Sequence, residues 1–238
     1  MRFLRTLRMP AGFILLLAFS SAHADEPKPT TENTIHVQLP APVTPQKFAR
    51  PIHFFVPEVI DRSGNAQPTL VLREKGGVFL DRPPAQIARE AISQSLKAAD
   101  LLAPDAASAE LVLQVYLFHF GLAHGSGLDF FGKVDFAVTV KNLKTGESQQ
   151  IQASGTSIAG LAVRKKNIQK NVQANIEAAL EDAVRNLLRG TQLKEAIAAL
   201  TKDSASARGV PVLMETAFFA IENRNRQQTL RKLYEEVT

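Results

Sequence analysis

The sequence predicts an α+β fold: a mixed or antiparallel sheet of about four to five strands, with two helices packed on one face and a helical C-terminal extension. Residues 110–122 and 134–141 have the length and the content of β-branched and aromatic residues that are typical of long strands. Residues 84–102 and 167–188 repeat apolar side chains at the spacing of amphipathic helices. Helices with one apolar stripe each must pack on another layer, and the sheet is the available layer.

The first 24 residues have the order of a secretory signal peptide. Three arginines precede a short apolar core at residues 13–19, and Ala22, His23 and Ala24 form a small-x-small cleavage site. The apolar core is shorter than the roughly 20 residues that a membrane-spanning helix needs. We therefore expect cleavage after Ala24, a mature chain that begins at Asp25, and a periplasmic location.

The composition excludes several classes of protein. The chain has no cysteine, so it forms no disulfide and lacks the lipid-carrying residue of a bacterial lipoprotein. Three of its 28 basic residues and none of its 23 acidic residues lie in the signal segment, which leaves a net charge of +2. That small charge and the compartment argue against a nucleic-acid binder. The absence of tryptophan and the presence of only two tyrosines disfavour a sugar-stacking platform.

The N-terminal half begins with a proline-rich leader at residues 25–50, which is either an extended spacer or contains a short strand at residues 35–39. Strands are expected at residues 52–56 and 69–73, and Pro57 places the first of them at an edge or a bulge. The first helix should begin near Pro84 and stop near residue 102.

The second half predicts the central sheet. Residues 110–122 are apolar on both alternating faces, which favours a strand that is central or covered on both sides. A turn at residues 142–147 leads to a polar strand at residues 148–158, nearer an edge. Gly190 should stop the second helix, and two helical segments should follow at residues 193–200 and 212–233. The residues expected in the core are Ile92, Leu96, Leu113, Val115, Leu117, Val138, Ile176, Leu180 and Val184.

Three stretches, at residues 87–99, 109–115 and 138–147, resemble the YajG-like envelope lipoproteins and the auxiliary lipoproteins of ABC-type lipid-transport systems. The resemblance covers roughly residues 52–190. It implies an α/β envelope domain at residues 51–190, with two helices on one face of a mixed sheet, and it implies assembly, scaffolding or binding rather than chemistry. Residues 191–238 then form the helical C-terminal extension. Because the lipidated cysteine is missing, the resemblance does not extend to outer-membrane anchoring.

A glycine-rich loop is expected at residues 121–132. One interpretation is a tip that docks a lipid or protein partner through His124, Leu128, Phe130 and Phe131. The other is a hairpin connection whose phenylalanines fold back onto the core. If the chain is extended there, the two adjacent rings point in opposite directions, and at most one of them covers the core.

A basic cluster, made of Arg164, Lys165, Lys166 and Lys170, lies beside the start of the second helix. Cations at a helix N-terminus oppose the helix dipole. The cluster is therefore either an anion-binding site for a lipid headgroup or phosphate, or a solvated basic loop.

The remaining patterns predict no catalytic site, no metal and no cofactor. His119, His124 and Asp129 match no common zinc spacing. Residues 155–160 are one residue too long for the nucleophile elbow of a serine hydrolase.

The sequence thus favours a non-enzymatic periplasmic binding or assembly module of the Gram-negative envelope. Its partner would be an envelope protein or a lipid surface, and the mature chain would have no transmembrane segment. The alternative is a periplasmic, hydrolase-like enzyme with its site at residues 121–132.

Overall fold

The computed structural model describes residues 27–48, 50–65, 69–72, 77–124, 130–157 and 167–201. Several sequence predictions therefore lie outside the described residues. These are the signal peptide, Leu128, Asp129, Arg164, Lys165, Lys166 and the helix at residues 212–233.

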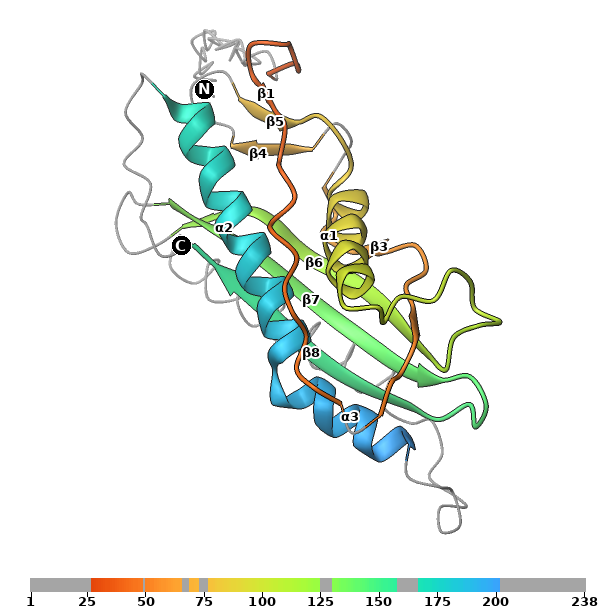
Figure 1. Cartoon of the computed structure of the whole chain (residues 1–238). Helices are drawn as coiled ribbons and strands as arrows, with labels where there is room; N and C mark the ends of the chain where they lie inside the picture. Colours follow the sequence, from red (N-terminus) through yellow and green to blue (C-terminus); the bar gives the residue numbers. More distant parts are fainter. Residues whose placement is uncertain are drawn as a thin grey trace, which may run out of the picture.

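The main sheet has five strands in the order β2-β6-β7-β8, with β3 also paired to β6 (Figure 1). The long strands β6, β7 and β8 form an antiparallel meander, whereas the two-residue strands β2 and β3 pair parallel to β6. The α+β class with a mixed sheet is confirmed, as are the central place of β6 and the edge position of β8. The bounds are β2 Phe54–Phe55, β3 Ile60–Asp61, β6 Leu111–His124, β7 Phe130–Asn142 and β8 Ser148–Thr156.

A second sheet of three short strands, which the sequence did not predict, lies at one end of the molecule. Its order is β1-β5-β4, with β1 Thr34–Ile35, β4 Leu70–Leu72 and β5 Val78–Leu80. β1 is shorter than the strand expected at residues 35–39. Beyond Ile35, the backbone forms hydrogen bonds with side chains instead of a neighbouring strand: the carbonyl of Val37 accepts one from Arg82 at 3.0 Å.

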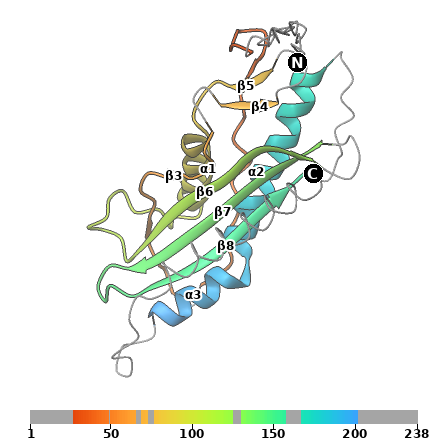
Figure 2. The same ribbon diagram turned by 180° about the vertical axis from the view of Figure 1, so that it is seen from behind.

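Three helices pack on one face of the main sheet: α1 Pro84–Ala98, α2 Ile168–Arg189 and α3 Thr191–Thr201 (Figures 1 and 2). α1 ends before the predicted residue 102. The reason is that Leu101 and Ala103 exchange backbone hydrogen bonds with Phe54, at 2.7 and 2.8 Å, and so extend the edge of the sheet. Gly190 follows α2 directly, as predicted.

The core lies between the sheet and the helices. Every residue predicted for it is at most 1% exposed. The leader contributes to the same cluster through Ile35, Val37 and Val43. β6 is buried on its helix-facing side and half-buried on its other side, so of the two expected alternatives, a central strand or one covered on both sides, the described residues show the central strand.

α2 approaches the sheet closely because two strand positions have no side chain. A Cβ atom on Gly132 would lie 2.0 Å from the carbonyl oxygen of Asn175, and one on Gly155 would lie 2.1 Å from the carbonyl oxygen of Ala179. Any larger residue would push the helix away from the strands. These glycines therefore set the distance between α2 and the sheet.

The free edge of β8 is covered by side chains of the helices. Gln192 accepts a hydrogen bond from the backbone N–H of Gln152 at 3.0 Å, and Asp182 accepts one from Thr156 at 3.2 Å. Asn186 donates to the carbonyl of Ser154 at 2.7 Å. Pairing of this edge with another strand is thereby disfavoured.

Candidate functional site

The tip of the β6–β7 hairpin, which the sequence singled out as a docking loop, is shorter than predicted. The antiparallel ladder continues through the pairs Ala123–Phe131 and His124–Phe130. Phe130 and Phe131 are therefore strand residues, and the prediction that they belong to a loop at residues 121–132 is wrong. The reason is that backbone pairing continues past the glycines, which carry no side chain that would interrupt it.

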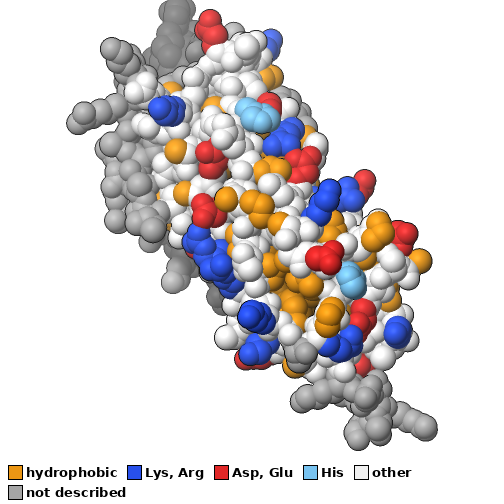
Figure 3. Space-filling view, viewed as in Figure 1, with side chains coloured by type: hydrophobic (Ala, Val, Ile, Leu, Met, Phe, Trp, Pro, Cys, Tyr) orange, Lys and Arg blue, Asp and Glu red, His pale blue; other side chains and the backbone are white. Residues whose placement is uncertain are grey.

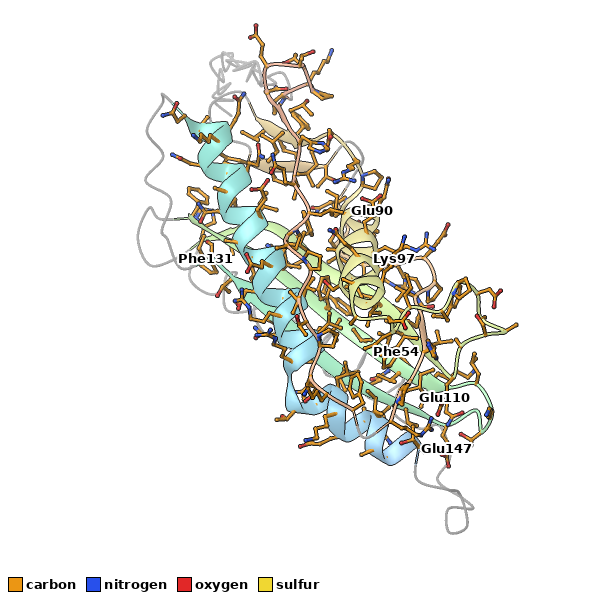
Figure 4. All side chains as sticks on the ribbon, viewed as in Figure 1. Phe54, Glu90, Lys97, Glu110, Phe131 and Glu147 are labelled. Carbon is orange, nitrogen blue, oxygen red and sulfur yellow. The ribbon has the colours of Figure 1, made fainter. Side chains whose placement is uncertain are left out.

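The two phenylalanines face opposite sides of the sheet, as the extended backbone requires. Phe130 packs against the core cluster, and its ring centroid lies 4.4 Å from that of His124. Phe131 is half-buried and occupies the alternate position, on the face away from the helices (Figure 4). Of the pair, Phe131 is thus the one placed to contact a partner.

A buried polar network holds the tip to β8 and α2. The N–H of Gly132 donates to Ser157 Oγ at 2.8 Å, and Ser157 Oγ donates to Asn175 Oδ1 at 2.5 Å. Asn175 Nδ2 donates in turn to the carbonyl of Asn171 at 2.9 Å. Because buried polar groups without partners are costly, this network fixes the base of the tip relative to the helix.

The predicted basic cluster is only partly described. Lys170 lies exposed in the first turn of α2, at the end of the molecule where the network anchors the hairpin tip. Arg164, Lys165 and Lys166 lie outside the described residues. Whether the four cations meet in one site stays a prediction.

His119 lies in a charged group on the outer side of the sheet. It is directly opposite Asp135 in the ladder, and Asp135 Oδ2 lies 2.9 Å from Lys133 Nζ. Burial, the largest influence, lowers the pKa of His119 below its usual value, while Asp135 opposes this shift and Lys133 adds to it. His119 Nε2 and Asp135 Oδ1 are buried without a hydrogen-bond partner.

The histidines that invited a metal interpretation do not come together. His119 shares the outer face with Asp135, whereas His124 lies on the side of Phe130, which packs against the core. Two residues on opposite faces of a strand cannot contribute to one ligand set. Across the described part of the chain, no group of three metal-ligating side chains is found.

A shallow hollow that sequence reasoning missed lies beside β1. His36 Nδ1 and Asp81 Oδ2 are 2.5 Å apart at its wall, although 45 residues separate them in the chain. No local pattern could have indicated a pair so distant in sequence. The hollow has a volume of about 490 Å³ and is lined by Pro29, Thr30, Thr31, Thr34, Ile35, His36 and Asp81. His36 is largely exposed, so the hollow is an open surface feature rather than an enclosed site.

The helix-bearing side of the molecule carries both signs of charge. Basic and acidic side chains are interspersed in the space-filling view, and the described residues form no continuous basic area on this face (Figure 3). Within the described ranges, none of the helices is both long and apolar enough to cross a bilayer.

No family model matches the sequence, and no curated protein resembles it at a significant level. Among solved structures, the chain is similar to a DUF330 protein from Xanthomonas campestris, with 12% identity, a TM-score of 0.53, and coverage of 71% of this chain and 99% of that one.

Two further solved structures are more distant. A PelC dodecamer from Paraburkholderia phytofirmans has 14% identity, a TM-score of 0.33 and coverage of 59% and 94%. A lipoprotein from Neisseria meningitidis has 16% identity, a TM-score of 0.26 and coverage of 50% and 91%. Nothing in these likenesses singles out the YajG-like proteins. At this level of identity, what the chain shares with the DUF330 protein is its fold.

Proposed function

We propose that this protein is an exported, non-enzymatic binding or assembly module of the Gram-negative cell envelope, and that it works in the periplasm. The N-terminal sequence pattern supports export, and the fold shared with a DUF330 protein is compatible with such a role. Because one fold hosts many unrelated functions, the hairpin tip supports this role more directly than the fold does.

The observation that carries the proposal is a partly exposed aromatic side chain on a rigid support. Phe131 is half-buried at the end of β7, on the side away from the helices. The next residue, Gly132, is tied to Ser157 and through it to α2. A partner that covers Phe131 therefore gains apolar burial without first ordering the strand that carries it.

The partner is an envelope protein or a lipid surface. His124 is exposed and pairs with Phe130, on the other face of β7 from Phe131, and Lys170 is exposed in the first turn of α2. Together with Leu128 and the basic residues Arg164, Lys165 and Lys166, they would supply an apolar contact flanked by positive charge. Such a surface suits anionic headgroups or an acidic patch on a protein.

A hydrolase-like site at the same tip is less well supported. A nucleophile and its base must lie within hydrogen-bond reach of each other. The two histidines of this region, His119 and His124, face opposite sides of the sheet.

The test compares two single variants of the mature protein. Phe131→Ser should reduce capture of the protein by its partner several-fold without a large change in melting temperature. Leu143→Ser is the matched control, because Leu143 is an apolar side chain, 39% exposed, in the turn at the opposite end of β7. Capture is measured in two arms: cross-linking in envelope extracts with mass spectrometry, and flotation with vesicles that contain an anionic phospholipid.

Loss of binding in only one arm identifies the class of partner. Equal binding by the wild-type protein, Phe131→Ser and Leu143→Ser in both arms would contradict the tip as the contact site.

A further inference from the structure

The leader lies in the helical layer as an extended chain that runs between α1 and α2 (Figures 1 and 2). Of residues 34–46, only the two of β1 belong to a strand. Buried and exposed side chains nevertheless alternate along it: Ile35 and Val37 are buried, whereas His36 and Gln38 are exposed. Such alternation is typical of an extended segment that lays one face against a surface.

Two pairs of apolar side chains anchor the leader to this surface. Ile35 and Val37 form the first pair and are 3% and 0% exposed, and Val43, which is 7% exposed, forms the second pair with the buried Pro45. The residues between the pairs, 39–42, are half-buried or exposed. The leader is therefore held by side-chain burial at two separate points. We call these four side chains the leader anchors.

Between and beside the anchors, side chains of α2 hold the backbone of the leader. Glu177 Oε1 accepts a hydrogen bond from the N–H of Gln38 at 2.8 Å. Arg189 Nε donates one to the carbonyl of Thr44 at 2.9 Å. Every peptide has such backbone groups, so these bonds contribute affinity, while the apolar anchors determine which sequences fit.

A buried serine on the apolar side of α1 serves the same purpose. Ser95 is 1% exposed, and its Oγ accepts a hydrogen bond from the N–H of Val43 at 3.1 Å while it donates one to the carbonyl of Ala91 at 3.0 Å. Buried polar groups are normally hydrogen-bonded, and the leader supplies the donor here. Ser95 thus binds the leader backbone at the second pair of anchors.

Two properties of the leader suit a ligand that can be exchanged. Its release breaks no long ladder, because β1 pairs with β5 through only two residues, and segments with few such bonds open at lower cost than core strands. Pro40, Pro42 and Pro45 favour an extended backbone before binding, which reduces the entropy that docking costs. A separate peptide of similar composition would share this second advantage.

We propose that the surface between α1 and α2 is a peptide-binding site. The leader occupies it within the same chain. An extended, proline-containing segment of a partner protein, with apolar residues at the four anchor positions, occupies it after displacing the leader. This site is separate from the proposed contact at Phe131, because it lies on the helix-bearing side of the sheet and Phe131 lies on the other face.

The test is a competition experiment in the full mature chain. The probe is a fluorescent synthetic peptide with the sequence of residues 33–46, and its binding is measured by fluorescence anisotropy. The double variant Val37→Ser/Val43→Ser weakens one anchor of each pair in the attached leader. Ala41→Ser is the matched control, because Ala41 is an exposed residue of the same segment.

The double variant should bind the probe at least about tenfold more tightly than the parent or Ala41→Ser, because an intact attached leader competes at a high effective concentration. A probe with the same two serine substitutions should not bind. Adding Ser95→Ala to the double variant should weaken binding several-fold, whereas adding Phe131→Ser should not change it.

A second form of the protein guards against a double variant that fails to fold. A protease recognition site is inserted directly before Arg50, which is exposed, and the leader keeps its natural sequence. After cleavage, the leader should elute together with the rest of the protein in size-exclusion chromatography. An excess of the probe should then replace it.

Three outcomes would overturn the proposal. Equal affinity of the probe for the parent, Ala41→Ser and a folded double variant would show that it binds elsewhere. Absence of binding to the folded double variant would show that the surface does not accept a separate peptide. In the cleaved protein, a leader that the probe cannot replace, or whose loss abolishes cooperative melting, would show that the leader is a fixed part of the core and not a ligand.

Discussion

The two faces of the main sheet are built by the same strands but differ in how they are packed. On the helix-facing side, Leu113, Val115 and Leu117 are at most 1% exposed, and the backbone of α2 touches the strands at Gly132 and Gly155. On the outer side, the alternate residues of β6 and β7 are half-buried and include the charged group of His119, Lys133 and Asp135. Alternation along a strand thus separates two faces, but the helices decide which of them becomes the core.

The largest expected difference between the faces concerns two neighbours on β6. Leu117→Ala should lower the free energy of unfolding by about 2–5 kcal/mol, because Leu117 is fully buried and its truncation leaves a cavity. Tyr116→Ala, on the half-buried outer side, should lower it less. Urea denaturation measures both. Equal losses would show that the two faces are packed equally tightly.

The close approach of α2 is the next feature to test. Gly155→Ala should destabilise the fold by about 1–3 kcal/mol or more, since its Cβ would lie 2.1 Å from backbone atoms of Ala179 and Ala183, which cannot move aside singly. Gly146→Ala is the control. Nothing lies within 4 Å of its Cβ, and only its positive φ of 76° adds strain, of roughly 1–2 kcal/mol. A greater loss for Gly146→Ala would contradict the close packing of α2.

The polar network at the base of the tip should be the third most sensitive element. Ser157→Ala leaves the N–H of Gly132 and Oδ1 of Asn175 without their buried partner, and it should reduce stability by about 1–3 kcal/mol. Thr156→Ala, at an exposed neighbouring position on the other face, should change stability by only about 0.5 kcal/mol or less. Thermal melting of the two variants side by side distinguishes them, and indistinguishable melting temperatures would argue against the network.

The smallest expected effect concerns the pH dependence of stability, and it comes from His119 on the outer face of the sheet. The folded-state pKa of His119 lies below its usual value, so the unfolded chain binds the proton more tightly. The stability that the neutral imidazole contributes is therefore complete above about pH 6.5, the ordinary value, and is lost as the pH falls through the lowered pKa. His119→Gln should weaken the decrease of melting temperature on acidification. An unchanged pH profile would show that His119 is not desolvated in the folded state.

Local patterns predicted the long elements well. The expected strand at residues 134–141 lies inside β7, and the expected second helix at residues 167–188 matches α2 to within one residue at each end. Both are long enough for their apolar periodicity to be distinct. The short strands were predicted less well: β5 was missed, because a three-residue strand with three buried side chains has no alternation that could reveal it.

The candidate site was predicted only in part, because its contacts join residues that lie on separate elements. Simple alternation predicted that at most one of Phe130 and Phe131 covers the core, without saying which one. The assignment of both to a loop was wrong because the ladder with β6 extends to His124. The network through Ser157 and Asn175, the pair of His36 with Asp81 and the opposition of His119 to Asp135 join residues from separate elements. No spacing in the sequence marks such contacts.

By itself, the sequence determined the α+β class, the order of the long strands and helices, and the identity of the core residues, because hydrophobic periodicity is a local property of each element. It also predicts export, which stays a prediction on the N-terminal pattern. Only the tertiary structure decided that the leader joins the core through Ile35, Val37 and Val43, and that two glycines bring α2 against the strands. Those features depend on which surfaces meet in space, and packing between distant segments is not encoded in the pattern of any one of them.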